Sequence, residues 1–93
     1  MKLAWSPRAQ RQLHAAFEHI AVDDPAAAWR VRDRIVERAE QLPEFLELGP
    51  KGQLAGTREL VITETSYVLV YRVKSDEVRV VAVWHSAQSR RRQ

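Results

Sequence analysis

The sequence predicts an α+β fold: an N-terminal strand and an antiparallel helical hairpin, followed by a three-stranded antiparallel meander. Two observations lead to this prediction. In the first half of the chain, two stretches carry apolar residues at helical spacing, and each begins with a helix-capping residue followed by proline. Between residues 58 and 85, three short strand-like segments are separated by polar turns. We therefore expect the hairpin to pack on one face of a small sheet that also takes up the N-terminal strand.

The N-terminal segment predicts a short strand and then a helix. The residues from Lys2 to Trp5 are mostly apolar and show the alternation that is typical of strands. Ser6 can cap the first helix, and Pro7 suits the first helical position because its missing N–H costs no hydrogen bond there. One apolar stripe follows at helical spacing: Ala9, Leu13, Ala16, Phe17 and Ile20.

A second helix is expected to begin at Asp24-Pro25 and to end at Pro43, which cannot continue a helix. Its apolar stripe consists of Ala28, Val31, Ile35, Ala39 and Leu42. Because only a few residues around Val22-Asp23 separate the two helices, they should pair as an antiparallel hairpin. The interleaved charges predict a solvated, ion-paired face, made of Arg30, Arg32, Asp33, Arg34, Glu37, Arg38 and Glu40.

The second half of the chain predicts a long loop and three strands. The loop, from Pro43 to Gly56, has no clear period and is long for so small a domain, which often indicates function. We expect the strands at residues 58–63, 67–73 and 78–85, and their short turns make neighbouring strands antiparallel. The last strand is apolar on both faces, which predicts a central position in the sheet.

Length and charge limit the classes of protein to be considered. In a chain of 93 residues we expect one domain over residues 1–88 and a basic tail over residues 89–93. The chain has 15 Lys and Arg against 12 Asp and Glu, so Arg90, Arg91 and Arg92 account for the whole net charge of +3. The remaining body is neutral, which argues against a protein that binds duplex DNA by itself.

Several other properties are expected to be absent. No apolar stretch approaches the length needed to span a bilayer, and the residues between Lys2 and Pro7 are too few for a signal peptide, so we expect a cytoplasmic protein. There is no cysteine, and His14 and His19 do not share a helical face, so we expect no disulfide, metal or cofactor. Gly-rich phosphate loops and the common hydrolase motifs are missing as well.

Five short motifs are spread over nearly the whole chain, from the first strand to the last. They are Leu3-Ala4-Trp5-Ser6-Pro7, Pro43-Glu44-Phe45-Leu46-Glu47-Leu48-Gly49, Gly56-Thr57-Arg58-Glu59-Leu60, Tyr67-Val68-Leu69-Val70-Tyr71-Arg72 and Val83-Trp84-His85. Together they resemble the RelE/ParE superfamily of toxins from bacterial type II toxin–antitoxin systems. The resemblance implies the fold described above and a cognate antitoxin protein as partner.

The resemblance leaves three functions open. ParE-like members poison DNA gyrase by binding it and are not enzymes, whereas RelE-like members cleave messenger RNA in the ribosome. A third reading is a relative of the fold that has lost toxicity and only binds its partner. The nucleases usually carry an arginine directly before the Leu-Val-Tyr of the middle strand, where this chain has Val68, and no Tyr or Arg follows in Ser86-Ala87-Gln88. Because valine cannot stabilise charge on a scissile phosphate, we expect a ParE-like gyrase inhibitor rather than an enzyme.

Candidate site residues follow from the resemblance and from residue type. His85 is the one candidate for proton transfer, because its unperturbed pKa lies near neutrality, and a structural hydrogen-bonding role is the favoured alternative. Residues assigned to target binding are Arg58, Arg72, Arg79, His85, Arg90, Arg91 and Arg92. Antitoxin binding is assigned to Trp29, Arg32 and Val36, to the sheet edge and to an apolar groove between helices and sheet. We expect no sequence-specific DNA binding except through the antitoxin.

Overall fold

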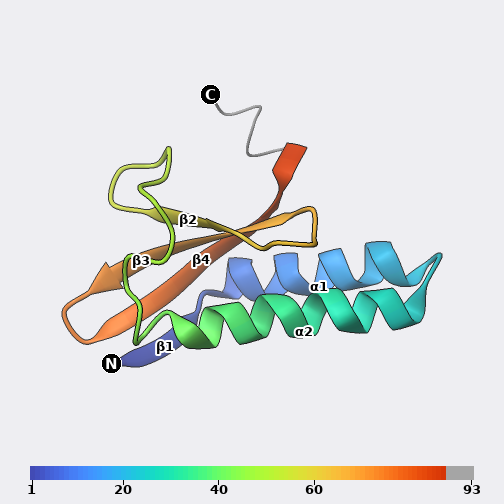
Figure 1. The fold of residues 1–93 in the computed structure, drawn as a ribbon, viewed down its shortest axis with the longest axis horizontal. Helices are drawn as coiled ribbons and strands as arrows, with labels where there is room; N and C mark the ends of the chain where they lie inside the picture. The colour runs from blue at the N-terminus through green and yellow to red at the C-terminus, as the bar shows by residue number, and fades with distance from the viewer. Residues whose placement is uncertain (88–93) are drawn as a thin grey trace.

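The computed structural model describes residues 1–87 and has two layers. In chain order the elements are β1 (Lys2–Trp5), α1 (Pro7–Ala21), α2 (Pro25–Gln41), β2 (Arg58–Val61), β3 (Tyr67–Lys74) and β4 (Glu77–His85). The two helices lie side by side along one face of the four-stranded sheet (Figure 1). This arrangement confirms the predicted α+β fold with its helical hairpin and three-stranded meander.

Both helices begin at the residues that the sequence predicts. The Ser6 side chain accepts a hydrogen bond from the backbone N–H of Ala9 at 3.0 Å, and the Asp24 carboxylate accepts one from Ala27 at 3.0 Å. A proline follows each cap, at a position where no intrahelical donor is lost. The second helix ends at Gln41, just before Pro43.

The strand order in the sheet is β1-β4-β3-β2, so β4 is central, as the sequence predicts. The β2–β3 and β3–β4 pairs are antiparallel, whereas β1 pairs with β4 in a parallel register. The sheet is therefore mixed, because the crossover through the hairpin brings the chain back to lie beside its first strand. A register shift between Val70 and Tyr71 leaves Val81 as an extra residue in β4.

The main core lies between the helices and the sheet. Ile35 of α2 and Leu42, which caps the end of that helix, are fully buried and pack with side chains of the sheet, among them Leu69, Tyr71 and Val80. A second, smaller cluster of Val70, Ala82 and Trp84 lies on the other face of the sheet. Neither helix of the described chain is long and apolar enough to cross a membrane.

Candidate functional site

The residues assigned to antitoxin binding lie together on the flank of α2 that faces α1. Trp29 is 55% exposed, and its ring packs edge-on against Phe17 of α1, with the ring centroids 4.7 Å apart. The guanidinium carbon of Arg32 lies 5.9 Å from the centre of the Trp29 ring, within the range of a cation–π interaction. Val36 follows one turn further along the helix and is half-buried. The three residues therefore form one surface.

A hollow of about 290 Å³ adjoins this surface, lined by Gln10, Leu13, His14, Phe17, Trp29 and Arg32. These residues come from α1 and α2 alone. The hollow beside Trp29 therefore lies between the two helices. An exposed tryptophan beside a cation and an apolar hollow is a common arrangement at protein-binding hot spots.

Arg58 holds the long loop onto the sheet. Its guanidinium donates to the Gly49 carbonyl at 2.8 Å, and it lies 4.0 Å from the carboxylate of Glu47. Arg58 pairs in register with Tyr71 and lies on the side of the sheet that carries the helices. These contacts give Arg58 a structural role, because its donors are directed at the protein's own loop.

Arg72 and Arg79 lie directly opposite each other in the β3–β4 register, on the sheet face that the helices do not cover. Arg72 donates to the Ala55 carbonyl at 3.0 Å, and Arg79 lies 3.5 Å from the carboxylate of Glu77. Side chains of like charge at opposed positions of two strands repel each other. The Ala55 carbonyl and the Glu77 carboxylate reduce this repulsion between the two arginines. This pair places two arginine side chains next to each other on that face of the sheet.

His85 lies at the far end of β4 from the arginine pair. It pairs in register with Tyr67, and the two rings meet edge to face with their centroids 5.4 Å apart. The Nδ1 atom of His85 accepts a hydrogen bond from the backbone N–H of Ala87 at 3.2 Å. Burial raises the pKa of the Tyr67 hydroxyl above its ordinary value, because the phenolate would lose its hydration.

The hollow beside His85 has a volume of about 440 Å³ and is lined by Gln12, Ala15, Ala16, His19, Tyr67, Val83, His85 and Ala87. These residues place His85 on the helix side of the sheet. Val68, at the position where the nucleases carry an arginine, pairs with Trp84 and is 4% exposed on the other face. His85 and position 68 therefore do not converge on one reacting group.

The residues assigned to target binding are thus divided among three places in the molecule. Arg58 faces the loop, the pair Arg72 and Arg79 occupies the uncovered face, and His85 lies at the opposite end of the sheet. The remaining assignments, Arg90, Arg91 and Arg92, lie outside the described residues. Within residues 1–87, no three His, Asp or Glu side chains lie close enough together to hold a metal ion.

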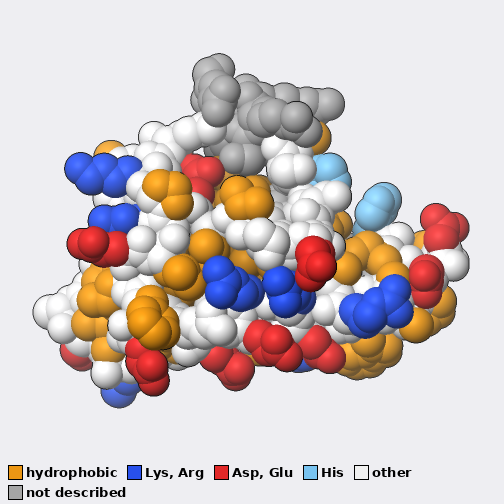
Figure 2. Space-filling model, viewed as in Figure 1, with side chains coloured by type: hydrophobic (Ala, Val, Ile, Leu, Met, Phe, Trp, Pro, Cys, Tyr) orange, Lys and Arg blue, Asp and Glu red, His pale blue; other side chains and the backbone are white. Residues whose placement is uncertain are grey.

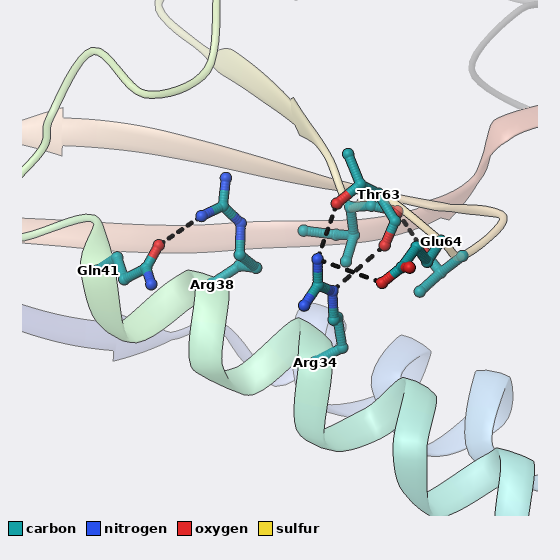
Figure 3. Close-up of polar contacts among 7 residues, drawn as sticks. Arg34, Arg38, Gln41, Thr63 and Glu64 are labelled. Atoms are coloured by element: carbon teal, nitrogen blue, oxygen red, sulfur yellow. Dashed lines mark hydrogen bonds and ion pairs between the residues drawn. The ribbon is translucent and has the colours of Figure 1, made fainter.

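The structure also assigns a role to Arg34, which the sequence does not single out. It donates from α2 to the Thr63 carbonyl at 3.3 Å and to the Thr63 hydroxyl at 2.9 Å, and it lies 3.6 Å from the Glu64 carboxylate (Figure 3). The partners of Arg34 thus lie outside its own helix, in the turn that follows β2. β2 ends at Val61, two residues before the predicted end, because the chain then turns and the Ile62 carbonyl accepts from the N–H of Thr65.

The fold and the exposed helical surface define a class of protein, the small α+β toxins of type II toxin–antitoxin systems. Residues 3–90 match the family described as the ParE toxin of the type II toxin–antitoxin system parDE. The chain belongs to this ParE toxin family.

Individual relatives agree with this assignment. Y4kP of Sinorhizobium fredii (strain NGR234) is 37% identical over 87 residues, which cover 94% of this chain and 90% of that protein. Toxin RelE3 of Caulobacter vibrioides is 37% identical over 86 residues, covering 90% of this chain and 92% of its own. A solved structure of the chromosomal ParDE TA system from P. aeruginosa is 25% identical, with a TM-score of 0.84, and the match covers 91% of this chain and 95% of that one.

Proposed function

We propose that this toxin arrests growth by binding DNA gyrase and that a cognate antitoxin neutralises it by covering the hairpin surface at Trp29, Arg32 and Val36. The observation that carries the choice of target is the buried Val68 at the position where nuclease members of the superfamily place a cation. Removing one charge-stabilising donor typically lowers catalysis by about 10²–10³. His85 does not replace the cation, because it lies on the other face of the sheet. These two observations support binding without catalysis as the proposed mode of action.

The contact with gyrase is assigned to the uncovered sheet face around Arg72 and Arg79, together with the arginines of the tail. The arginine pair offers positive charge to acidic or phosphate groups of a gyrase–DNA complex. Since gyrase acts in the cytoplasm, the same proposal places the toxin there. Neither His85 nor Arg58 is required at this contact, because both face other parts of the chain.

The target is tested by two assays run on one preparation of purified toxin. The first measures supercoiling by gyrase and the accumulation of cleaved DNA, and the second measures cleavage of messenger RNA in translating ribosomes. The proposal expects inhibited supercoiling with trapped cleaved DNA, and intact messages. If a stoichiometric amount of toxin cleaves messenger RNA at specific positions while supercoiling by gyrase stays normal, the target is the ribosome and not gyrase.

A RelE-like ribonuclease is the second candidate function, and two observations favour it. Two of the relatives, both from Caulobacter vibrioides, carry the name RelE, and His85 shares its hollow with His19 and Gln12. In that case the His85→Ala substitution should abolish toxicity, whereas a gyrase inhibitor should keep it. Expression without the antitoxin separates both candidates from a relative that has lost toxicity, since that protein would not slow growth.

A further inference from the structure

Four basic side chains gather at one end of the sheet face that the helices do not cover. They come from three adjacent strands: Lys2 from β1, Arg72 and Lys74 from β3, and Arg79 from β4. Side chains alternate along a strand, and the core beneath the helices contains the residues next to these four, so the four point to the opposite face. We call them the basic patch.

Positive charge exceeds negative charge in this part of the sheet. Glu77 lies between Lys2 and Lys74 in the register, and its carboxylate is 3.5 Å from the guanidinium of Arg79. Glu59, on the same face of β2, directs its carboxylate to a backbone N–H of the long loop. One carboxylate of these strands therefore serves four cations. On the side of the molecule that Figure 2 shows, by contrast, Lys and Arg side chains lie close to Asp and Glu side chains.

The two arginines of the patch are held in place by the protein. Arg72 donates to the Ala55 carbonyl at 3.0 Å, and a Cβ atom at Gly56 would lie 2.9 Å from a guanidinium nitrogen of Arg72. The side chain of Arg79 remains 40% exposed beside Glu77. Residues two apart on a strand are separated by about 7 Å, and neighbouring strands by about 4.8 Å. The sheet thus presents cations from fixed, regularly spaced positions.

Charge without an apolar anchor suits a phosphate backbone better than a protein. The apolar cluster of this face, Val70, Ala82 and Trp84, is 3% exposed or less, so it offers no hot spot to a protein partner. A single-stranded nucleic acid fits less well than a duplex, because single strands bind by stacking their bases on exposed aromatic rings. Trp84 is the one aromatic residue that this face has within residues 1–87. A duplex needs no such ring, since it presents phosphates that arginine binds with paired donors.

We propose that the basic patch binds the phosphate backbone of the duplex DNA that gyrase holds, without reading its sequence. This rests on the proposed function and deepens it, because it assigns the uncovered face to DNA rather than to the gyrase protein. Phosphate contacts alone give dissociation constants of about 10⁻⁴–10⁻⁶ M at physiological salt. A body with no net charge is sufficient for such weak binding, because gyrase presents its DNA at a high effective concentration once the toxin is bound.

The experiment measures the binding of the whole toxin to a short fluorescent duplex of random sequence and to a single-stranded DNA of the same length. Fluorescence anisotropy is recorded at several salt concentrations between about 50 and 200 mM. The duplex should bind more tightly than the single strand, and the logarithm of its affinity should fall linearly with the logarithm of the salt concentration. Absence of duplex binding at about 10⁻⁴ M toxin, or tighter binding of the single strand, would overturn the inference.

Three variants and a control locate the binding. Lys74→Gln and Arg79→Gln should each weaken duplex binding about fivefold at low salt and reduce the salt slope by about 1. Arg11→Gln removes the same charge from an exposed position of α1 and should change neither quantity. Glu77→Gln removes the carboxylate beside Arg79 and should tighten duplex binding up to about fivefold, which a damaged fold would not do.

The tail is present in every variant, so its charge does not affect these comparisons. Patch variants that bind the duplex like the wild-type toxin, or an equal loss in the α1 control, would contradict the proposal. A Glu77→Gln variant that binds the duplex no more tightly than the wild-type toxin would also contradict it.

The outcome can be separated from that of the proposed function. If the toxin inhibits gyrase but Lys74→Gln and Arg79→Gln neither weaken duplex binding nor reduce inhibition, this inference fails alone. If the duplex binds through the basic patch while supercoiling stays normal, the proposed target fails and the DNA-binding surface stands.

Discussion

The hydroxyl group of Tyr71 accepts a hydrogen bond from the backbone N–H of Gly49 at 2.9 Å. The same hydroxyl donates to the Leu46 carbonyl at 2.9 Å, so one side chain of the central sheet fixes two points of the long loop. Gly49 is required at this point because a Cβ atom there would lie 2.8 Å from the backbone of Glu59. The loop is therefore anchored to the core rather than free on the surface.

Substitution of Tyr71 by phenylalanine should test this anchor. The change leaves the Gly49 N–H buried without an acceptor, and the free energy of unfolding should fall by about 1–3 kcal/mol. Denaturant unfolding measures the loss, with Tyr67→Phe at neutral pH as the matched control, because the hydrogen bonds that hold Leu46 and Gly49 of the loop come from Tyr71 and not from Tyr67. An equal loss in both variants would show that the loop contacts of Tyr71 contribute nothing specific.

Charge placed on the hairpin surface should abolish neutralisation. Trp29→Glu and Val36→Glu each put a carboxylate into an apolar contact, and each should cost at least about 2 kcal/mol of antitoxin binding if these are hot spots. Thermal stability should change little for Trp29→Glu, because that side chain is more than half exposed. Rescue of growth by co-expressed antitoxin is the measurement, and Glu37→Lys on the outer side of α2 is the control. Full rescue of both variants would place the interface elsewhere.

Stability should fall in alkaline solution through Tyr67. Burial raises the pKa of its hydroxyl in the folded chain above the value in the unfolded chain, which is about 10. Below that pH both states hold the proton, and the stabilisation is fully present. As the pH rises past it, the unfolded state ionises first, so stability declines until the folded pKa is passed. Unfolding curves from neutral pH upward should show a steeper decline for the wild-type chain than for Tyr67→Phe.

Deletion of residues 89–93 should weaken toxicity and leave thermal stability nearly unchanged. The deletion removes Arg90, Arg91 and Arg92, which account for the net charge of +3. Their contribution to the encounter with gyrase is electrostatic, so the difference between the full and the shortened chain should shrink at high salt. Antitoxin binding through the helices should survive. Full toxicity of the shortened chain at low salt would show that the tail does not contribute to target binding.

Local signals predicted most of the fold. Ser6-Pro7 and Asp24-Pro25 gave the helix starts, and the apolar stripes gave the faces that meet the sheet. The parallel pairing of β1 could not be predicted in the same way, since its partner is distant in the chain and no turn connects the two strands. The contacts of Arg34 could not be predicted for the same reason, because its partners lie in the turn between β2 and β3, far from it in the chain.

The arrangement of the site residues was less predictable because of one extra residue in β4. Val78 and Val80 face the helices, but the irregularity at Val81 shifts the alternation, so that Val83 and His85 face the helices in their turn. A regular alternation from Val80 would have placed His85 on the opposite face. The apolar residues on both sides of this strand conceal the shift in the sequence.

The pairing of β1 with β4 has a consequence for synthesis of the toxin. The first strand of the chain meets its partner only when the last strand has been made, and β4 is also central to the meander. A chain that grows from its N-terminus can form the helical hairpin early, because those contacts are local. It cannot close its sheet until β4 has left the ribosome. The closed sheet, and every surface that depends on it, therefore forms only after β4 has been synthesised.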